Sequence, residues 1–260
     1  MKKLIIACSL FATFFFNPTM AQDMLYVHKN GMVTHQIAIT DIDSITFKLE
    51  PKSFITDADG NIYTTITIGT QTWLVENLKT KHFNNGDAIP NITDGNSWTN
   101  LSTAAWCDYD NYSSGDSDYG HLYNWYAATD KRGVAPIGYR VATDNDWTIL
   151  ENYLKLNFGT SLNEAKALAS KTGWSSSSNS NSPGNNTSIN NSSGFSAYPA
   201  GYRDGTSGNF TSQGWTAIWI TATEYDANQA YNRFIYFNFD YFTRNPYLKK
   251  SGLAVRCVKN

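Results

Sequence analysis

The side chains of this sequence that are best suited to chemistry fall in its loops, and the densest group of them is acidic. Asp108, Asp110, Asp116 and Asp118 share one stretch rich in Ser and Gly. Carboxylate oxygens are the ligands that hard cations prefer, so a convergent set of them could bind calcium. A solvated acidic loop explains the same pattern without a metal. We favour this second interpretation and predict no metal site and no cofactor.

Aromatic residues form the second group. Loops that could bind a ligand are predicted at 83–101, 108–118, 174–194 and 203–216, and Trp98, Trp174 and Trp215 lie in or beside them, together with Tyr112, Tyr202 and Phe210. An exposed indole face can stack on the C–H face of a sugar, while Asn and Asp side chains bond its hydroxyls. We therefore predict Trp98, Trp174 and Trp215 as ligand-binding residues, with core packing as the alternative for each. For Trp73, Trp125, Trp147 and Trp219 we predict core packing.

Nothing in the spacing of nucleophiles and carboxylates predicts catalysis, so we expect a protein that is not an enzyme. The sequence has no CxxC or HExxH motif, and its four histidines are scattered. Glu76, Glu151, Glu164 and Glu224 show no spacing that marks a catalytic pair. Two cysteines, Cys107 and Cys257, remain after the N-terminal segment described next. An exported protein permits a disulfide between them, and two free thiols are the alternative.

The first 21 residues are typical of a secretory signal. Lys2 and Lys3 precede an apolar run that is too short for a membrane span, and Thr19-Met20-Ala21 offers a cleavage site before Gln22. A lipid-attachment site at Cys8 is a weaker alternative, because the apolar run continues beyond this residue. We expect a secreted or cell-surface protein without a membrane span.

Composition favours an extracellular β-rich module. Aromatic residues make up 15% of the chain, whereas charged residues make up only 16%, against a usual share of about 25%. The formal net charge of −2 provides no basic field, so nucleic acid is not an expected partner. An extracellular glycan or a surface protein is the partner that we expect.

Hydrophobic patterning divides the chain into parts. A small β unit is predicted at 22–50, with a hairpin turn at Asn30-Gly31. A linker follows at 51–55, and the main domain occupies 56–260. Strands predicted in this domain include 63–68, 72–75, 104–109, 198–202, 217–222, 230–238 and 253–258.

Two helices are predicted between these strands. The first runs from Asp144 to about Phe158, with a capping box formed by Thr143 and Asp146. The second runs from about Leu162 to Lys171. The segment 174–194 is almost entirely Ser, Asn, Thr and Gly, so a long mobile loop is expected there. The fold class is therefore α+β, with a twisted antiparallel sheet, two helices and long loops.

Seven segments of the main domain, taken in order, resemble the Fibrobacter succinogenes major paralogous domain, a family of exported bacterial modules. They are 57–63, 68–78, 119–125, 138–147, 193–203, 219–225 and 251–259. They include Trp73-Leu74-Val75-Glu76-Asn77-Leu78 and Tyr119-Gly120-His121-Leu122-Tyr123-Asn124-Trp125. Upstream, 41–47 resembles the end of a small module found after the signal in secreted proteins of the Bacteroidota.

The resemblance implies a C-type-lectin-like fold, distantly related to formylglycine-generating enzymes, and a role in binding or adhesion with a glycan as the leading ligand. A structural or protein-binding surface module is the alternative, and an enzyme of the formylglycine-generating kind is a weaker one. The Glu-Pro-Asn type of motif of sugar-binding lectins is absent. Val134-Ala135-Pro136 replaces the Cys-Pro usual in the family, which leaves Cys257 to pair with Cys107 or to stay free. Ala142 replaces a second usual proline.

Overall fold

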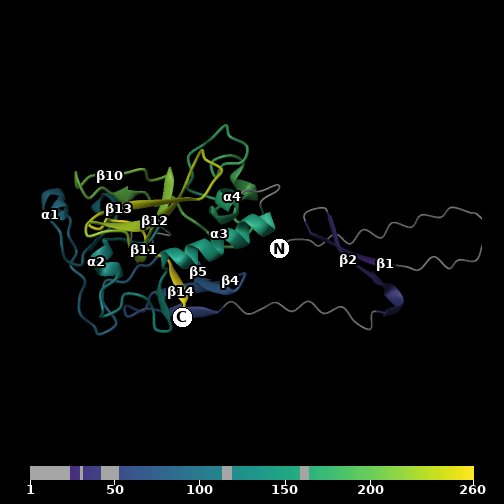
Figure 1. Ribbon diagram of the computed structural model, residues 1–260, viewed down its shortest axis with the longest axis horizontal. Helices are drawn as coiled ribbons and strands as arrows, with labels where there is room; N and C mark the ends of the chain where they lie inside the picture. The colour runs from purple at the N-terminus through teal and green to yellow at the C-terminus, as the bar shows by residue number, and fades with distance from the viewer. Residues whose placement is uncertain (1–23, 30–31, 42–52, 113–118, 159–163) are drawn as a thin grey trace, which may run out of the picture. The chain divides into compact units, whose positions relative to one another are not determined.

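The computed structural model describes residues 24–29, 32–41, 53–112, 119–158 and 164–260 (Figure 1). The chain divides into two compact units, Met1–Pro51 and Lys52–Asn260. The sequence predicted the boundary between the small β unit and the main domain at 51–55. The start predicted for the main domain, residue 56, is too late, because Phe54 and Ile55 already belong to a strand of the second unit.

The first unit contains the predicted hairpin. Strands β1 (Met24–Lys29) and β2 (Met32–Ala38) pair antiparallel, with a bulge between Val27 and His28. A short 3-10 helix, η1 (Ile39–Asp41), follows. The predicted turn at 30–31, the signal segment 1–21 and the end of the predicted β unit, 42–50, lie outside the described residues.

The second unit is α+β, with two main antiparallel sheets instead of the single sheet expected. The larger sheet has the order β3 (Phe54–Thr56), β4 (Ile62–Ile68), β5 (Gln71–Leu74), β14 (Cys257–Lys259) and β8 (Tyr139–Val141). The smaller one has the order β11 (Thr216–Glu224), β12 (Gln229–Tyr236) and β13 (Thr243–Leu248). Two short pairs join β6 (Trp106–Cys107) to β7 (Leu122–Tyr123) and β9 (Tyr202–Arg203) to β10 (Phe210–Thr211).

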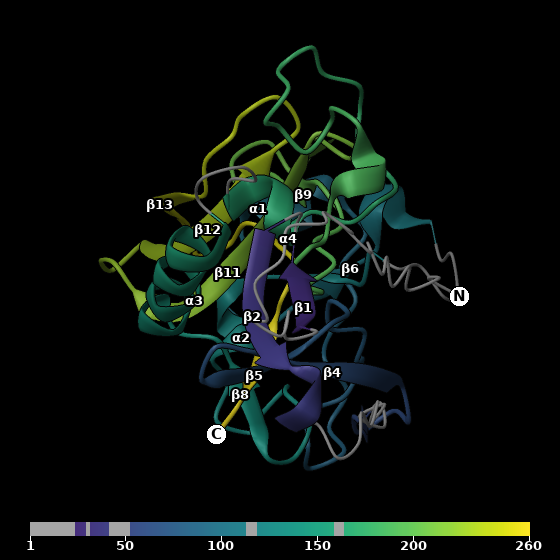
Figure 2. The same cartoon turned by 90° about the vertical axis from the view of Figure 1, so that its right-hand side faces the viewer.

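The helices confirm the strongest local prediction. Helix α3 spans Asp144–Phe158. Thr143 Oγ1 accepts the Asp146 backbone N–H at 3.3 Å, and Asp146 Oδ2 accepts the Thr143 N–H at 2.7 Å, which is the predicted capping box. Figures 1 and 2 show α3 alongside β11 and β12, which it contacts.

The other helices are short: α1 (Gly95–Thr99), α2 (Trp125–Ala128) and α4 (Glu164–Leu168). The second predicted helix was too long at its C-terminal end, because the chain after Leu168 bonds to another segment. Ser170 donates its N–H to the Ala197 carbonyl, and Ala169 forms a bridge with Ala197. Within the described residues, no helix has the length and apolar character needed to cross a membrane.

The main core is aromatic. Trp73, Trp147 and Trp219 are fully buried around Phe195, and the rings of Trp147 and Trp219 stack with centroids 5.1 Å apart. These three core predictions are confirmed, whereas Trp125 is only half-buried. Aromatic pairs of this kind add about 0.5–1.5 kcal/mol each beyond the burial of their area.

Candidate functional site

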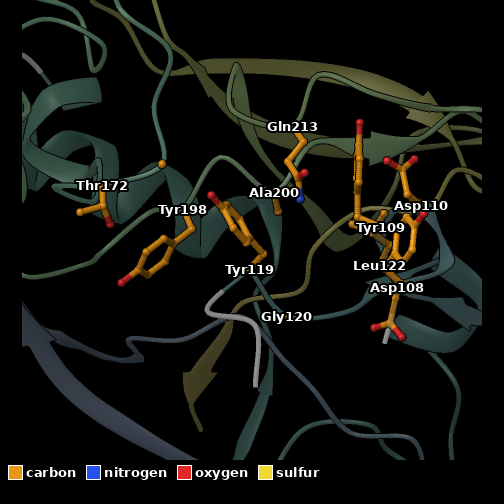
Figure 3. A pocket seen from close by; sticks show the side chains of 12 residues that line it. Asp108, Tyr109, Asp110, Tyr119, Gly120, Leu122, Thr172, Tyr198, Ala200 and Gln213 are labelled. Atoms are coloured by element: carbon orange, nitrogen blue, oxygen red, sulfur yellow. The ribbon is translucent and has the colours of Figure 1, made fainter. Parts of the chain in front are cut away.

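A pocket of about 470 Å³ opens in the second unit (Figure 3). That volume is in the range of about 300–1,000 Å³ typical of small-molecule sites. Its lining is mostly tyrosine and short polar side chains. The lining residues are Asp108, Tyr109, Asp110, Tyr112, Tyr119, Gly120, Leu122, Thr172, Gly173, Tyr198, Ala200 and Gln213.

The pocket forms where several loops meet. The first is the described part of the predicted loop 108–118, which includes the 3-10 helix η2 (Tyr109–Asn111). The others are the turn at 172–173 before the Ser/Asn-rich segment, the chain at 198–200, and the predicted loop 203–216, which contributes Gln213. Gly201 N–H bonds to the Thr216 carbonyl and Gly214 N–H to the Pro199 carbonyl, so two of these segments are fixed to each other.

Tyr119 and Tyr198 form one side of the pocket, and Tyr109 and Asp110 lie on the other (Figure 3). The rings of Tyr119 and Tyr198 meet edge to face, with centroids 5.9 Å apart. Tyr109 packs on Phe210 at 5.3 Å and is hydrogen-bonded by the Gln213 backbone. These contacts hold the rings in fixed orientations before any ligand binds.

Asp108 is held by a histidine. The Nδ1 of His121 lies 2.6 Å from Asp108 Oδ1, and the imidazole ring packs on Trp106 with centroids 4.3 Å apart. Burial lowers the pKa of His121 below its ordinary value of 6.5, although the Asp108 carboxylate acts in the opposite direction. We therefore assign a neutral ring at pH 7 that donates Nδ1–H to the carboxylate. One Asp108 oxygen is thus engaged by the protein.

The three predicted binding tryptophans have different environments. Trp215 is 48% exposed and follows the pocket residue Gln213 by two positions. Trp174 is 9% exposed and donates its indole N–H to Ser170 Oγ at 3.1 Å, so its ring belongs to the core. Trp98 is 0% exposed. The predictions for Trp98 and Trp174 as exposed binding residues are wrong.

The burial of Trp98 has a specific cause. The guanidinium of Arg203, itself buried, stacks between the rings of Trp98 and Phe210 at 4.6 Å from each centroid. The same guanidinium donates to the carbonyls of Ile92 and Thr93. Helix α1, which contains Trp98, therefore packs over a buried cation, a long-range contact that local sequence patterning does not reveal.

The two cysteines are free thiols, so the structure contains no Cys107–Cys257 disulfide. Cys107 packs in a small cluster with Trp98 and Leu122, whereas Cys257 lies in the larger cluster around Tyr63 and Val255. Burial raises the pKa of each thiol to about 12. The thiolate that nucleophilic chemistry needs is disfavoured at both positions.

No group of three or more His, Cys, Asp or Glu side chains with metal-binding geometry occurs in the described part of the chain. Of the four acidic residues considered as calcium ligands, Asp108 and Asp110 line the pocket, and Asp116 and Asp118 lie outside the described residues. The two described carboxylates give the pocket an acidic side.

Sequence reasoning did not single out Tyr119 and Tyr198 as site residues. Both tyrosines belong to segments that carried the family resemblance, and neither lies in a loop predicted to bind a ligand. A usable signal was the glycine next to Tyr119. Gly120 has φ +73°, and a Cβ there would lie 2.6 Å from the Asn77 Cβ, so glycine at this position lets the Tyr119 segment approach Asn77 closely.

Gly173 provides a test of the pocket wall. Its φ is +88°, and an added Cβ would lie 2.7 Å from the Tyr119 hydroxyl. Gly173→Ala should cost about 1–3 kcal/mol in the free energy of unfolding, through backbone strain and this steric contact, and should displace the Tyr119 hydroxyl. Denaturant unfolding of the purified protein measures the loss.

Gly86→Ala is the matched control. Gly86 has φ +89° but no atom within 4 Å of an added Cβ, so it reports backbone strain alone. If the two variants lost the same free energy of unfolding, the contact with the Tyr119 hydroxyl would contribute nothing to the cost of Gly173→Ala.

The comparisons with known proteins identify one family. The family model described as the Fibrobacter succinogenes major domain matches residues 66–259. No curated protein and no solved structure matches the chain. The matched range includes every residue that lines the pocket.

Proposed function

The chain belongs to the Fibrobacter succinogenes major domain family, and we propose that this member is an exported, non-catalytic module that binds a glycan in its tyrosine-lined pocket. The proposal includes a signal peptide at 1–21 and a secreted or cell-surface location. It also includes a C-type-lectin-like arrangement of 56–260, in which loops above the sheets bind the ligand. The meeting of the loops around the pocket supports this arrangement.

The composition of the pocket wall is the observation that carries the proposal. Four tyrosine rings, at 109, 112, 119 and 198, offer flat apolar faces. The side chains of Asp108, Asp110, Thr172 and Gln213 offer oxygens and an amide beside them. A pyranose ring has the complementary pattern, with an apolar C–H face and a rim of hydroxyls. Tyrosine suits such a boundary because its ring is apolar and its hydroxyl is polar.

The buried thiols favour a binding role over the oxygen-activating chemistry of formylglycine-generating enzymes. That chemistry needs two cysteines close together, and here Cys107 and Cys257 lie in different clusters with raised pKa values.

Tyr112→Ala tests the proposal directly. Tyr112 is a highly exposed lining residue, so its removal should leave the free energy of unfolding nearly unchanged. Loss of one stacking ring should weaken binding of the recognised oligosaccharide by about tenfold or more, measured by titration calorimetry.

Tyr225→Ala is the control, because Tyr225 is an exposed tyrosine that does not line the pocket. Equal affinity of the two variants would contradict the assignment of the pocket as the glycan site.

A further inference from the structure

A row of aromatic side chains lies outside the pocket. It consists of Trp215, Phe237, Tyr236, Phe239 and Tyr241, which we call the aromatic row. Successive ring centroids along it are separated by 5.8, 5.1, 5.2 and 5.1 Å. Phe239 and Tyr241 are stacked with an interplanar angle of 14°. Trp215, Phe239 and Tyr241 are 48%, 38% and 50% exposed, and the two other rings are half-buried.

The segment that carries the row is firmly held. Phe242, next to Tyr241, is buried, and its ring packs on that of Trp147 at 5.8 Å in the main core. Phe237 donates its N–H to the Trp215 carbonyl at 2.7 Å. The exposed rings are therefore held by a fixed backbone. Exposure of apolar rings to water is unfavourable and does nothing to stabilise the core, so a cluster of them on the surface indicates a binding site.

A polar loop adjoins the row. We call residues 175–193 the Ser/Asn loop. Its Gly184 N–H donates to the Phe237 carbonyl at 2.8 Å, and its Asn179 side chain donates to the Asn238 carbonyl at 3.1 Å. Amide and hydroxyl groups thus lie beside aromatic rings, which repeats the chemistry of the pocket wall on an open surface.

The sequence segments that carry the row and the Ser/Asn loop contain almost no charged residues. No Asp, Glu, Lys, Arg or His occurs in 172–195 or in 205–217, and 236–242 contains one, Asp240. A surface that binds phosphate, sulfate or uronate would need cationic partners. Rings with neutral amides and hydroxyls instead match a neutral ligand that has C–H faces and hydroxyls.

We propose that the aromatic row and the Ser/Asn loop form a second binding surface for an extended, neutral polysaccharide chain. The inference rests on the proposed function and names its ligand class. Trp215, at one end of the row, follows the pocket residue Gln213 by two positions in the sequence. A ligand on a row of several rings must itself be several sugar units long, so the module binds polymer more tightly than a short oligosaccharide.

The double variant Phe239→Ser, Tyr241→Ser tests this surface. Both residues are exposed and outside the pocket, so the protein should fold as the wild type does. We expect binding to the insoluble neutral polysaccharides cellulose and linear mannan to weaken by at least about tenfold, while affinity of the pocket for cellobiose or mannobiose changes less than about twofold. Sedimentation of full-length protein with each polysaccharide gives the first value and calorimetry the second.

The control is Phe54→Ser, Tyr225→Ser, which removes one exposed phenylalanine and one exposed tyrosine outside the aromatic row. Unchanged polysaccharide binding by the Phe239, Tyr241 variant would overturn the inference, whereas the Tyr112→Ala result would still test the pocket separately. Binding of the row to phosphatidylcholine vesicles, with none to polysaccharide, would also overturn it. A folded wild-type protein that binds no glycan would remove both proposals.

Discussion

Arg256→Leu is expected to lower the free energy of unfolding by more than about 4 kcal/mol. The side chain is completely buried and donates to the carbonyls of Leu74, Val75, Phe195 and Ser196. Its Nε and Nη2 also donate to Asn77 Oδ1, at 3.2 and 3.0 Å. Each buried acceptor left without a donor costs about 1–3 kcal/mol.

The position of Arg256 explains the size of this effect. Its guanidinium packs on the Phe195 ring, 4.2 Å from the centroid, and burial lowers its pKa. The carbonyl oxygens around it offset the cost of burying the charge. One side chain therefore ties β5 and its following residues to the turn at 195–196. The loss is measurable by guanidinium unfolding followed by tryptophan fluorescence.

Arg132→Leu serves as the comparison. Arg132 pairs with Asp87 and Asp130 on the surface, where water and salt screen ion pairs, so its loss should change stability far less. If the Arg256 and Arg132 variants lost the same stability, the assignment of Arg256 as an internal tie would be wrong.

Lys166→Met is expected to loosen the Ser/Asn loop and to cost about 2 kcal/mol in the free energy of unfolding. Lys166 is buried in α4, and its Nζ donates to the carbonyls of Ser182, at 3.0 Å, and Asn185. Methionine fills the same space but donates no hydrogen bond, so these carbonyls lose a donor. Burial lowers the pKa of the amine, and the two acceptors offset that cost.

Hydrogen exchange of the loop amides is the sensitive measurement for this variant. The Ser177, Ser182 and Asn185 N–H groups are bonded within the loop and should exchange faster when Lys166 is absent. Lys155→Met is the control, because Lys155 is exposed and pairs only with Glu151 among the contacts described. Unchanged exchange in the Lys166 variant would show that the loop is held by other contacts.

The composition of the Ser/Asn loop did not reveal the contacts that hold it. Its composition predicted a mobile segment, because it offers no apolar anchors. The anchors are polar instead: Lys166 reaches it from α4, and Asn190 donates to the carbonyls of Ser170 and Pro183 at 2.9 Å. Every Asn and Lys side chain can donate such hydrogen bonds. Composition alone therefore does not identify the residues that join distant segments in this way.

Local sequence patterns predicted the structure most accurately where the contacts that define an element lie within that element. Helix α3 begins and ends where its capping box and apolar spacing predicted. Strand β13, which contains Pro246, was not predicted. In the described sheet, β13 pairs only with β12, and an edge strand tolerates proline because one side of it needs no donor.

The candidate site was predictable only in part. Two of its predicted loops, 108–118 and 203–216, do contribute residues to one pocket, and Trp215 is exposed as predicted. The predictions for Trp98 and Trp174 were wrong because the burial of a side chain depends on partners far along the chain. Trp98 is covered by Arg203, and Trp174 packs in the main core. The family resemblance is confirmed, yet it carries no ligand with it.

The most direct measurement of the central claim is a glycan-binding screen of the folded full-length protein, made with and without EDTA. We expect saturable binding to one class of neutral glycan, unaffected by EDTA and at least about tenfold weaker for Tyr112→Ala. Absence of binding to every glycan, by protein whose cooperative unfolding shows it to be folded, would contradict the account. Binding that EDTA abolishes would contradict its prediction that no metal takes part.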